Sequence, residues 1–203
     1  AGSYGDVAVL SFNANKTVAG GGGGMLLTHS ADIAKRVHYL AWQARDGPGY
    51  IHHEVGYNYR MSDLQAAVIL GQVERLEEIL AAKRAVARAY QEGLGGLDGV
   101  AFMPIPPWVE PSWWLWSLLL PSRWRQRMQA ALWAEGIDAR PLWQPMHESP
   151  AHRGPCLEDG TVASWLYRRA LSLPSSPGLG PEGAQRIAEI TRRIYLTGGK
   201  VGA

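Results

Sequence analysis

The first third of the chain alternates short apolar runs with one helical pattern. Residues 7–12 form a short, continuous and partly β-branched apolar run, which predicts a buried strand. Five consecutive glycines at 20–24 precede a second short strand predicted for residues 25–28. Ser30 is a candidate N-cap for a helix over residues 31–43, with an acidic residue in its first turn.

A long helix is predicted to follow a loop-like segment rich in Gly, His, Tyr and Asn at residues 45–61. Ser62 or Asp63 would cap this helix, and its apolar residues recur at three- and four-residue steps along one face. The pattern meets no helix breaker until Gly93. A helix on the order of 30 residues is long for one domain and favours a bridge between two.

The second half alternates strand-like and helix-like segments, which is typical of a small α/β layer. The sequence therefore predicts an α/β fold in two parts, with residues 1–84 ending in the bridging helix and residues 85–203 forming a small α/β domain. The expected strands lie at 100–103, 113–120, 137–143 and 171–174, and the expected helices at 122–135, 162–170 and 181–195.

Composition and charge exclude several classes of partner. The formal net charge is +2, and 46% of the residues are hydrophobic, so the chain has a core but no basic tract for nucleic acid or anionic membranes. No apolar run reaches the roughly 18–20 residues of a membrane span, and no signal peptide is evident. A single cysteine, Cys156, forbids an internal disulfide and is compatible with the cytoplasm. No metal-ligand spacing is found.

The start of the chain predicts missing neighbours. The strand expected at 7–12 begins almost at the first residue, whereas a buried strand needs neighbours at both edges and on both faces. We therefore expect this sequence to be a piece of a longer protein.

The segment from Ser11 to Lys16 offers the richest chemistry. It follows a predicted strand, and ligands of open α/β sheets bind at that end of the strands. The segment carries a hydroxyl, the amides of Asn13 and Asn15, and the Lys16 amine. Desolvation makes a lysine amine nucleophilic, so it could form a Schiff base with an aldehyde. Two plainer interpretations are a solvated surface lysine and a glycine run that serves as a linker.

Three blocks resemble one enzyme family. They are Ser-Phe-Asn-Ala-Asn-Lys at 11–16 with the glycines after it, His-His-Glu-Val-Gly-Tyr-Asn-Tyr-Arg-Met-Ser-Asp at 52–63, and Gly-Ile-Asp-Ala-Arg-Pro-Leu-Trp-Gln-Pro-Met-His at 136–147. In order and spacing they closely resemble the DegT/DnrJ/EryC1/StrS family of pyridoxal 5'-phosphate (PLP) dependent sugar aminotransferases. The first and third blocks look most like the branch that aminates UDP-linked 4-keto-6-deoxy-N-acetylglucosamine on the way to bacillosamine-type sugars.

This resemblance implies the C-terminal part of a fold-type-I PLP-dependent aminotransferase. Residues 1–84 would be the end of the PLP-binding large domain with the bridging helix, and residues 85–203 the small domain. The implied reaction moves an amino group, from glutamate in this family, to a keto group of a nucleotide-linked deoxysugar for glycan or polysaccharide biosynthesis.

The resemblance also assigns cofactor-binding residues. Lys16 matches the Schiff-base lysine, which also moves a proton during catalysis, and Ser11 matches the hydroxyl that binds the PLP phosphate. Asn58 matches a residue that reaches the PLP phosphate of the neighbouring subunit, which implies a homodimer with shared active sites. The plainer interpretations are a serine that caps its own turn and a turn asparagine before the next helix.

Four further residues are candidates for the substrate site. Arg60 could bind a sugar-nucleotide phosphate or the donor carboxylate, or it could be a structural partner of Glu54. His53, Trp143 and His147 lie in family-matching blocks and could line a sugar pocket, although a lone histidine is more often structural. Most of the nine tryptophans are expected in the core.

One family feature is missing. The acid that pairs with the pyridine nitrogen lies well upstream of the lysine in the family, and Asp6 is the one acid before Lys16. As an excerpt of a longer enzyme, or half of a two-chain one, the chain fits the aminotransferase interpretation. As a complete product it would be a non-catalytic remnant or a dimerising interaction module. A nucleotide-binding role is disfavoured, because the glycine run matches neither common phosphate-loop spacing.

Overall fold

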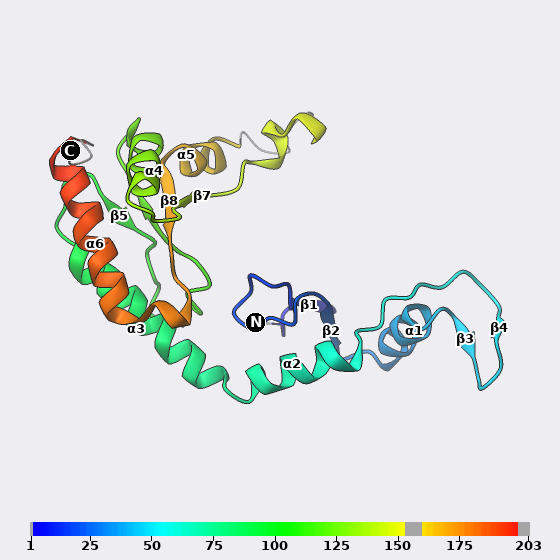
Figure 1. Cartoon of the computed structure of the whole chain (residues 1–203). Helices are drawn as coiled ribbons and strands as arrows, with labels where there is room; N and C mark the ends of the chain where they lie inside the picture. The colour runs from blue at the N-terminus through cyan, green and yellow to red at the C-terminus, as the bar shows by residue number, and fades with distance from the viewer. Residues whose placement is uncertain (1, 153–159, 199–203) are drawn as a thin grey trace. The chain divides into compact units, whose positions relative to one another are not determined.

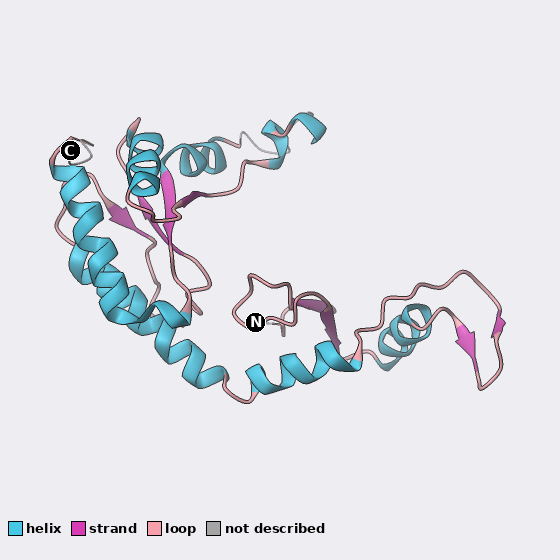
Figure 2. Ribbon diagram, in the orientation of Figure 1, coloured by secondary structure: helices cyan, strands magenta, loops and turns pink. Residues whose placement is uncertain are grey.

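The structure, a computed structural model, describes residues 2–152 and 160–198. The chain forms two compact units that divide between Leu76 and Glu77. The boundary predicted at residues 84 and 85 falls further along, inside a helix. Helices and strands are mixed in both units (Figure 2), so the α/β composition is confirmed.

The first unit opens with a hairpin. Strand β1 (Val7–Ser11), labelled near the N-terminus in Figure 1, pairs antiparallel with β2 (Gly24–Thr28). The prediction that this strand is buried is wrong, because Val9 is 74% exposed and most of the strand faces solvent. The physical reason is that, among the described residues, β1 pairs with β2 alone, so its apolar side chains lack a covering layer.

Helix α1 (Ala31–Ala41) begins where the sequence predicts. The Ser30 side chain accepts a hydrogen bond from the Ile33 backbone N–H at 3.3 Å, which satisfies one of the free donors of the first turn. The loop predicted after this helix contains a short hairpin that the sequence did not indicate, formed by β3 (Arg45–Asp46) and β4 (Ile51–His52).

The predicted long helix is two helices, α2 (Asp63–Val73) and α3 (Leu76–Leu94). Ser62 caps the first with a capping box. At the break, the Arg75 N–H bonds the Gln72 carbonyl at 3.1 Å, a three-residue step that tightens the last turn. Because neither glycine nor proline marks this point, the sequence predicted a continuous helix.

The second unit is built on one four-stranded sheet with antiparallel pairing throughout, in the order β5-β6-β8-β7. Its segments match the predicted ones but are mostly shorter. The strands are β5 (Ala101–Phe102), β6 (Trp116–Leu119), β7 (Arg140–Pro141) and β8 (Ala170–Leu173); the helices are α4 (Trp124–Ala134), α5 (Thr161–Arg169) and α6 (Gly180–Leu196), with 3₁₀ turns at Met146–Glu148, Pro150–His152 and Pro177–Leu179.

The core of the second unit lies between this sheet and helices α3, α4 and α6. Tyr90 and Trp116 are fully buried and stack with their ring centroids 4.7 Å apart. The Tyr90 hydroxyl donates to the Pro174 carbonyl at 2.7 Å, and burial raises the pKa of this phenol. Each fully buried large apolar side chain, such as Leu132 or Ile194, contributes roughly 1.5–3 kcal/mol.

The tryptophans are mostly not in the core, which corrects the prediction. Trp116 alone among the nine is buried, and five are exposed. The reason is that several stack on another tryptophan or lie under an arginine near the surface, so they are only partly covered. The exposed ones are Trp42, Trp108, Trp133, Trp143 and Trp165. Among the described helices, none has the length and apolarity that crossing a bilayer would require.

Candidate functional site

Lys16 lies in a closed loop between β1 and β2, here called the lysine loop (residues 12–23). The Lys16 N–H donates to the Asn13 carbonyl at 2.9 Å, and the Gly20 N–H donates to the Phe12 carbonyl at 2.8 Å. Phe12 is buried, with 6% of its surface exposed. The glycine run is therefore part of a folded loop, which excludes its interpretation as a linker.

Helix α2 holds the lysine loop in place. The Gln72 amide accepts from the Ala19 N–H at 3.0 Å and donates to the Ala19 carbonyl at 2.6 Å. A Cβ at Gly20 would lie 2.6 Å from the Ile69 side chain, and Gly23 has a φ of 85°, which favours glycine. The glycines thus allow the loop backbone to approach the helix closely.

The two predicted cofactor residues at the start of the chain share this loop region. Lys16 is half-buried, and Ser11 is exposed at the end of β1. The Ser11 hydroxyl lies 3.5 Å from the Asn13 N–H, which is too long for a strong turn-capping bond. The Asn13 side chain is used inside the loop, where it accepts from the Ala14 N–H at 2.8 Å. A weakly engaged hydroxyl and an amine therefore occupy one backbone segment.

Asn58 lies in an extended segment that is fixed to the end of α1. Its backbone forms an isolated antiparallel bridge with Trp42, and the Tyr57 N–H donates to the Leu40 carbonyl at 2.8 Å. A Cβ on Gly56 would come within 2.1 Å of the backbone just after α1, so only glycine fits there. The Asn58 side chain is exposed on this rigid segment.

Arg60 does not pair with Glu54, which corrects one of its two interpretations. Glu54 instead pairs with Arg36 through both of its carboxylate oxygens, and this guanidinium lowers the pKa of the Glu54 carboxyl. The Arg60 guanidinium lies 4.8 Å from the ring centre of Trp42, a cation–π contact. Trp42 therefore positions both Asn58, through the backbone, and Arg60.

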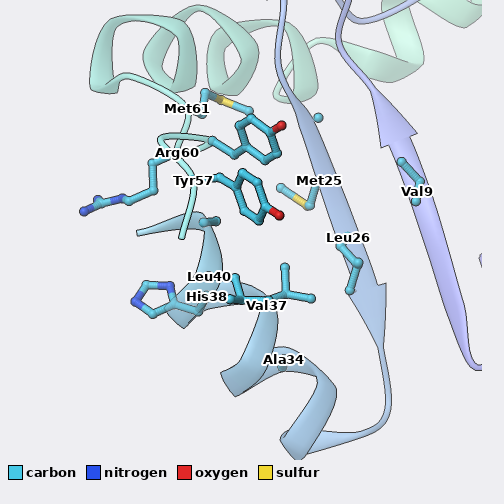
Figure 3. A pocket seen from close by; sticks show the side chains of 13 residues that line it. Val9, Met25, Leu26, Ala34, Val37, His38, Leu40, Tyr57, Arg60 and Met61 are labelled. Carbon is cyan, nitrogen blue, oxygen red and sulfur yellow. The ribbon is translucent and has the colours of Figure 1, made fainter. Parts of the chain in front are cut away.

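A largely apolar cavity of about 650 Å³ lies in the first unit (Figure 3). In this view the Tyr57 ring points toward Met25, whereas Arg60 runs away from the strands. Arg60 is the one predicted site residue on its wall, so the cavity is distinct from the lysine loop. Its lining residues are Val9, Gly24, Met25, Leu26, Ala34, Val37, His38, Leu40, Ala41, Tyr57, Tyr59, Arg60 and Met61.

The second unit carries Trp143 and His147. Trp143 is 65% exposed and stacks on Trp114, with centroids 5.5 Å apart and ring planes 25° apart. The His147 Nε2 lies 3.4 Å from the Ser164 hydroxyl and 3.9 Å from a Glu148 carboxylate oxygen. His147 is thus part of a polar network, while Trp143 presents an aromatic surface to solvent.

His53 lies in the first unit and makes a surface ion pair. Its Nε2 is 3.5 Å from the Asp46 carboxylate, and both side chains are largely exposed. Within residues 2–152 and 160–198, no group of three or more His, Cys, Asp or Glu side chains could hold a metal ion. Cys156 lies outside the described residues.

The sequence did not indicate the residues that hold the predicted site residues in place. Gln72, Ile69 and Trp42 fix the lysine loop and the Asn58 segment in the first unit, and Trp114 supports Trp143 in the second. One signal was readable, because Gln72 is a polar residue inside the otherwise apolar C-terminal half of α2.

Comparison with known proteins settles the family. The model of the DegT/DnrJ/EryC1/StrS aminotransferase family matches residues 1–192. The chain belongs to this family. It is 34% identical to EpsN of Bacillus subtilis (strain 168), over 97% of this chain and 52% of that protein. EpsN is named as a pyridoxal phosphate-dependent aminotransferase. GDP-perosamine synthase of Caulobacter vibrioides is 33% identical over 96% of this chain and 54% of that protein.

The solved structures agree with this membership. A crystal structure of a family aminotransferase from Brucella abortus has a TM-score of 0.84 at 28% identity, and it covers 95% of this chain and 52% of its own. The chain therefore spans about half the length of the curated relatives it matches.

Proposed function

We propose that the protein containing this chain is a PLP-dependent transaminase that moves an amino group to a keto group of a nucleotide-linked deoxysugar. The observation that carries the proposal is Lys16, half-buried on a loop that Gln72 and the packed glycines fix to α2, in a member of this aminotransferase family. A fixed loop matters because covalent catalysis needs the amine in one place. Glutamate is the proposed amino donor.

Lys16 and Ser11 fit PLP chemically. A lysine amine condenses with an aldehyde, and the Ser11 hydroxyl is free enough to donate to a phosphate oxygen. When bound, PLP supplies the electron sink for transamination. The acid for its ring nitrogen and the aromatic group that stacks on the ring would come from outside this chain, since Asp6 is the one acid before Lys16.

Lys16 would also serve as the proton carrier. Its amine would move a proton between the α-carbon of the amino donor and C4′ of the cofactor, which is general acid–base catalysis by a positioned side chain. The closed loop holds the backbone of Lys16 in place, which limits the positions that its amine can take.

Asn58 and Arg60 would complete the site of a neighbouring subunit. An exposed amide on a segment fixed to α1 can donate to the PLP phosphate of that subunit without adding charge. The Arg60 guanidinium, held over Trp42, suits a sugar-nucleotide phosphate or the donor carboxylate. A homodimer with shared active sites is therefore the proposed assembly.

His53 in the first unit, and His147 and Trp143 in the second, are the further candidates for substrate contacts, and Trp143 offers the largest open aromatic surface of the three. The names of relatives cover GDP-, dTDP- and UDP-linked sugars, so they do not select a nucleotide. The blocks at 11–16 and 136–147 favour UDP-linked 4-keto-6-deoxy-N-acetylglucosamine as the first substrate to test.

The test is an amino-transfer assay on the protein made from its complete reading frame. With PLP, glutamate and the UDP-linked keto sugar, we expect 2-oxoglutarate and the amino sugar in equal amounts. Lys16→Ala should abolish turnover, whereas Lys35→Ala, on the exposed surface of α1, should not. Turnover that survives Lys16→Ala would contradict the proposal. A stable dimer that neither binds PLP nor turns over any sugar would favour the interaction module.

A further inference from the structure

Lys83 is a buried cation in the second unit. It lies on α3 with 4% of its surface exposed. Its Nζ donates to three backbone carbonyls, those of Trp113 and Trp114 at 3.2 Å each and that of Ser175 at 2.8 Å. An ammonium has three donors, and each has an acceptor here. Such a complete set of bonds holds the backbone around it, because a shift of either segment would leave the buried ammonium short of an acceptor.

The three carbonyls belong to two segments that adjoin neighbouring strands of the sheet. Trp113 and Trp114 precede β6, and Ser175 follows β8. The Ser175 hydroxyl also donates to the Trp114 carbonyl at 3.3 Å. Trp113 has a φ of 50°, a left-handed conformation that strains a bulky residue and persists only where the surroundings impose it. Lys83 binds the carbonyl of that strained residue and of the next one.

This fixed backbone carries an aromatic pair. The Trp114 ring stacks on Trp143, which comes from the loop after β7 and is exposed. The pair offers a flat apolar face to solvent, and sugar rings and nucleobases both stack on such faces. Trp143 has Trp114 as its stacking partner, so the position of Trp114 sets the position of the open face.

We propose that Lys83 is a positioning residue for substrate recognition: by holding the Trp113–Trp114 backbone, it fixes the Trp114–Trp143 pair as a stacking platform for the nucleotide-sugar. This inference rests on the proposed function. It adds Trp114 to the substrate site as the residue beneath Trp143, and it gives Lys83 a role although its ammonium is inaccessible to substrate.

A platform role and a merely structural role differ in what they change. If Lys83 only stabilises the fold, its loss lowers stability and leaves the substrate parameters of the folded enzyme unchanged. If it positions the platform, its loss weakens binding of the nucleotide-sugar and leaves binding of glutamate unchanged. Stacked indoles also give an exciton couplet in the far-ultraviolet circular dichroism spectrum, which reports the Trp114–Trp143 geometry without any activity.

The experiment uses the PLP-loaded protein from its complete reading frame with Lys83→Met, Trp114→Leu and the matched control Lys35→Met. We expect Lys83→Met and Trp114→Leu to raise KM for the nucleotide-sugar about tenfold, with KM for glutamate changed less than about twofold. Both should lose the exciton couplet, and Lys35→Met should match the unmodified enzyme in every readout.

Two results would overturn the inference. One is an intact exciton couplet in folded Lys83→Met. The other is an unchanged KM for the nucleotide-sugar in Trp114→Leu. The second result tests the platform even where Lys83→Met does not fold. Should the unmodified enzyme turn over no nucleotide-sugar, the proposed function fails. The couplet then still shows whether Lys83 sets the geometry of the pair.

Discussion

The contact between Gly20 and Ile69 predicts a sharp response to one added methyl group. In Gly20→Ala the new Cβ would lie 2.6 Å from both Cγ1 and Cδ1 of Ile69. Neither side has room to move, because Ile69 is 5% exposed and the Gly20 N–H is bonded to the Phe12 carbonyl at 2.8 Å. Restoring a normal carbon–carbon contact needs a shift of about 1 Å, and overpacking of this kind costs about 1–3 kcal/mol.

A matched control lies two residues along. At Gly22 the nearest atom to a new Cβ is the Gln65 side-chain nitrogen at 3.4 Å, an ordinary contact. Gly22→Ala should therefore change the free energy of unfolding by less than about 1 kcal/mol. Gly20→Ala should also weaken PLP binding, because the strain falls on the loop that carries Lys16.

A double-mutant cycle isolates the clash. Ile69→Ala alone should cost about 2–5 kcal/mol as a buried large-to-small change. In that background Gly20→Ala should cost little, since both clashing carbons are gone, which gives a favourable coupling of about 1–3 kcal/mol. Urea unfolding and PLP titration measure the two effects. Additive costs, or a Gly20→Ala as mild as Gly22→Ala, would refute the packing of the lysine loop on α2.

Three further changes have defined outcomes. Gln72→Met removes the hydrogen-bond partner of both Ala19 backbone groups. It should lower the free energy of unfolding by about 2–4 kcal/mol and speed amide hydrogen exchange at Ala19. Unchanged exchange at Ala19 would argue against a role of Gln72 in holding the lysine loop. Arg123 has a φ of 71°, so Arg123→Gly should raise the free energy of unfolding in urea by about 0.5–1 kcal/mol. Gln126→Gly, inside α4, should lower it by a similar amount. The reverse order would contradict the left-handed conformation of Arg123. Burial lowers the pKa of Lys83 below its ordinary 10.5, so between the two values the unfolded chain holds a proton that the folded chain has lost. The stability of the unmodified protein relative to Lys83→Met should therefore rise with pH in that window, and a fall there would show that the charged form is favoured by folding.

Features that a few neighbouring residues determine could be predicted from the sequence. Ser30 and Ser62 cap α1 and α2 as expected, because a serine side chain satisfies the free N–H groups of a helix start wherever it occurs. The loop that carries Lys16 was also readable as a connection between two strands, because polar side chains and glycines separate two apolar runs there. In each case a few neighbouring residues determine the structure.

Features set by packing were not readable. The break at Arg75 has no glycine or proline, and the hairpin of β3 and β4 is too short to leave an alternating pattern. The exposure of β1 depends on which other strands cover it, which its own apolar residues cannot tell. Lys83 resembled any helical lysine, because its three carbonyl partners are distant in sequence.

The location of bound PLP decides whether Lys16 is the Schiff-base lysine of this protein. The protein from its complete reading frame is loaded with PLP, reduced with borohydride, digested and mapped by mass spectrometry. We expect one covalent phosphopyridoxyl group on the peptide that contains Lys16, and none after Lys16→Ala. A label confined to Lys35, Lys83 or Lys200, or no label on a folded protein, would contradict this expectation.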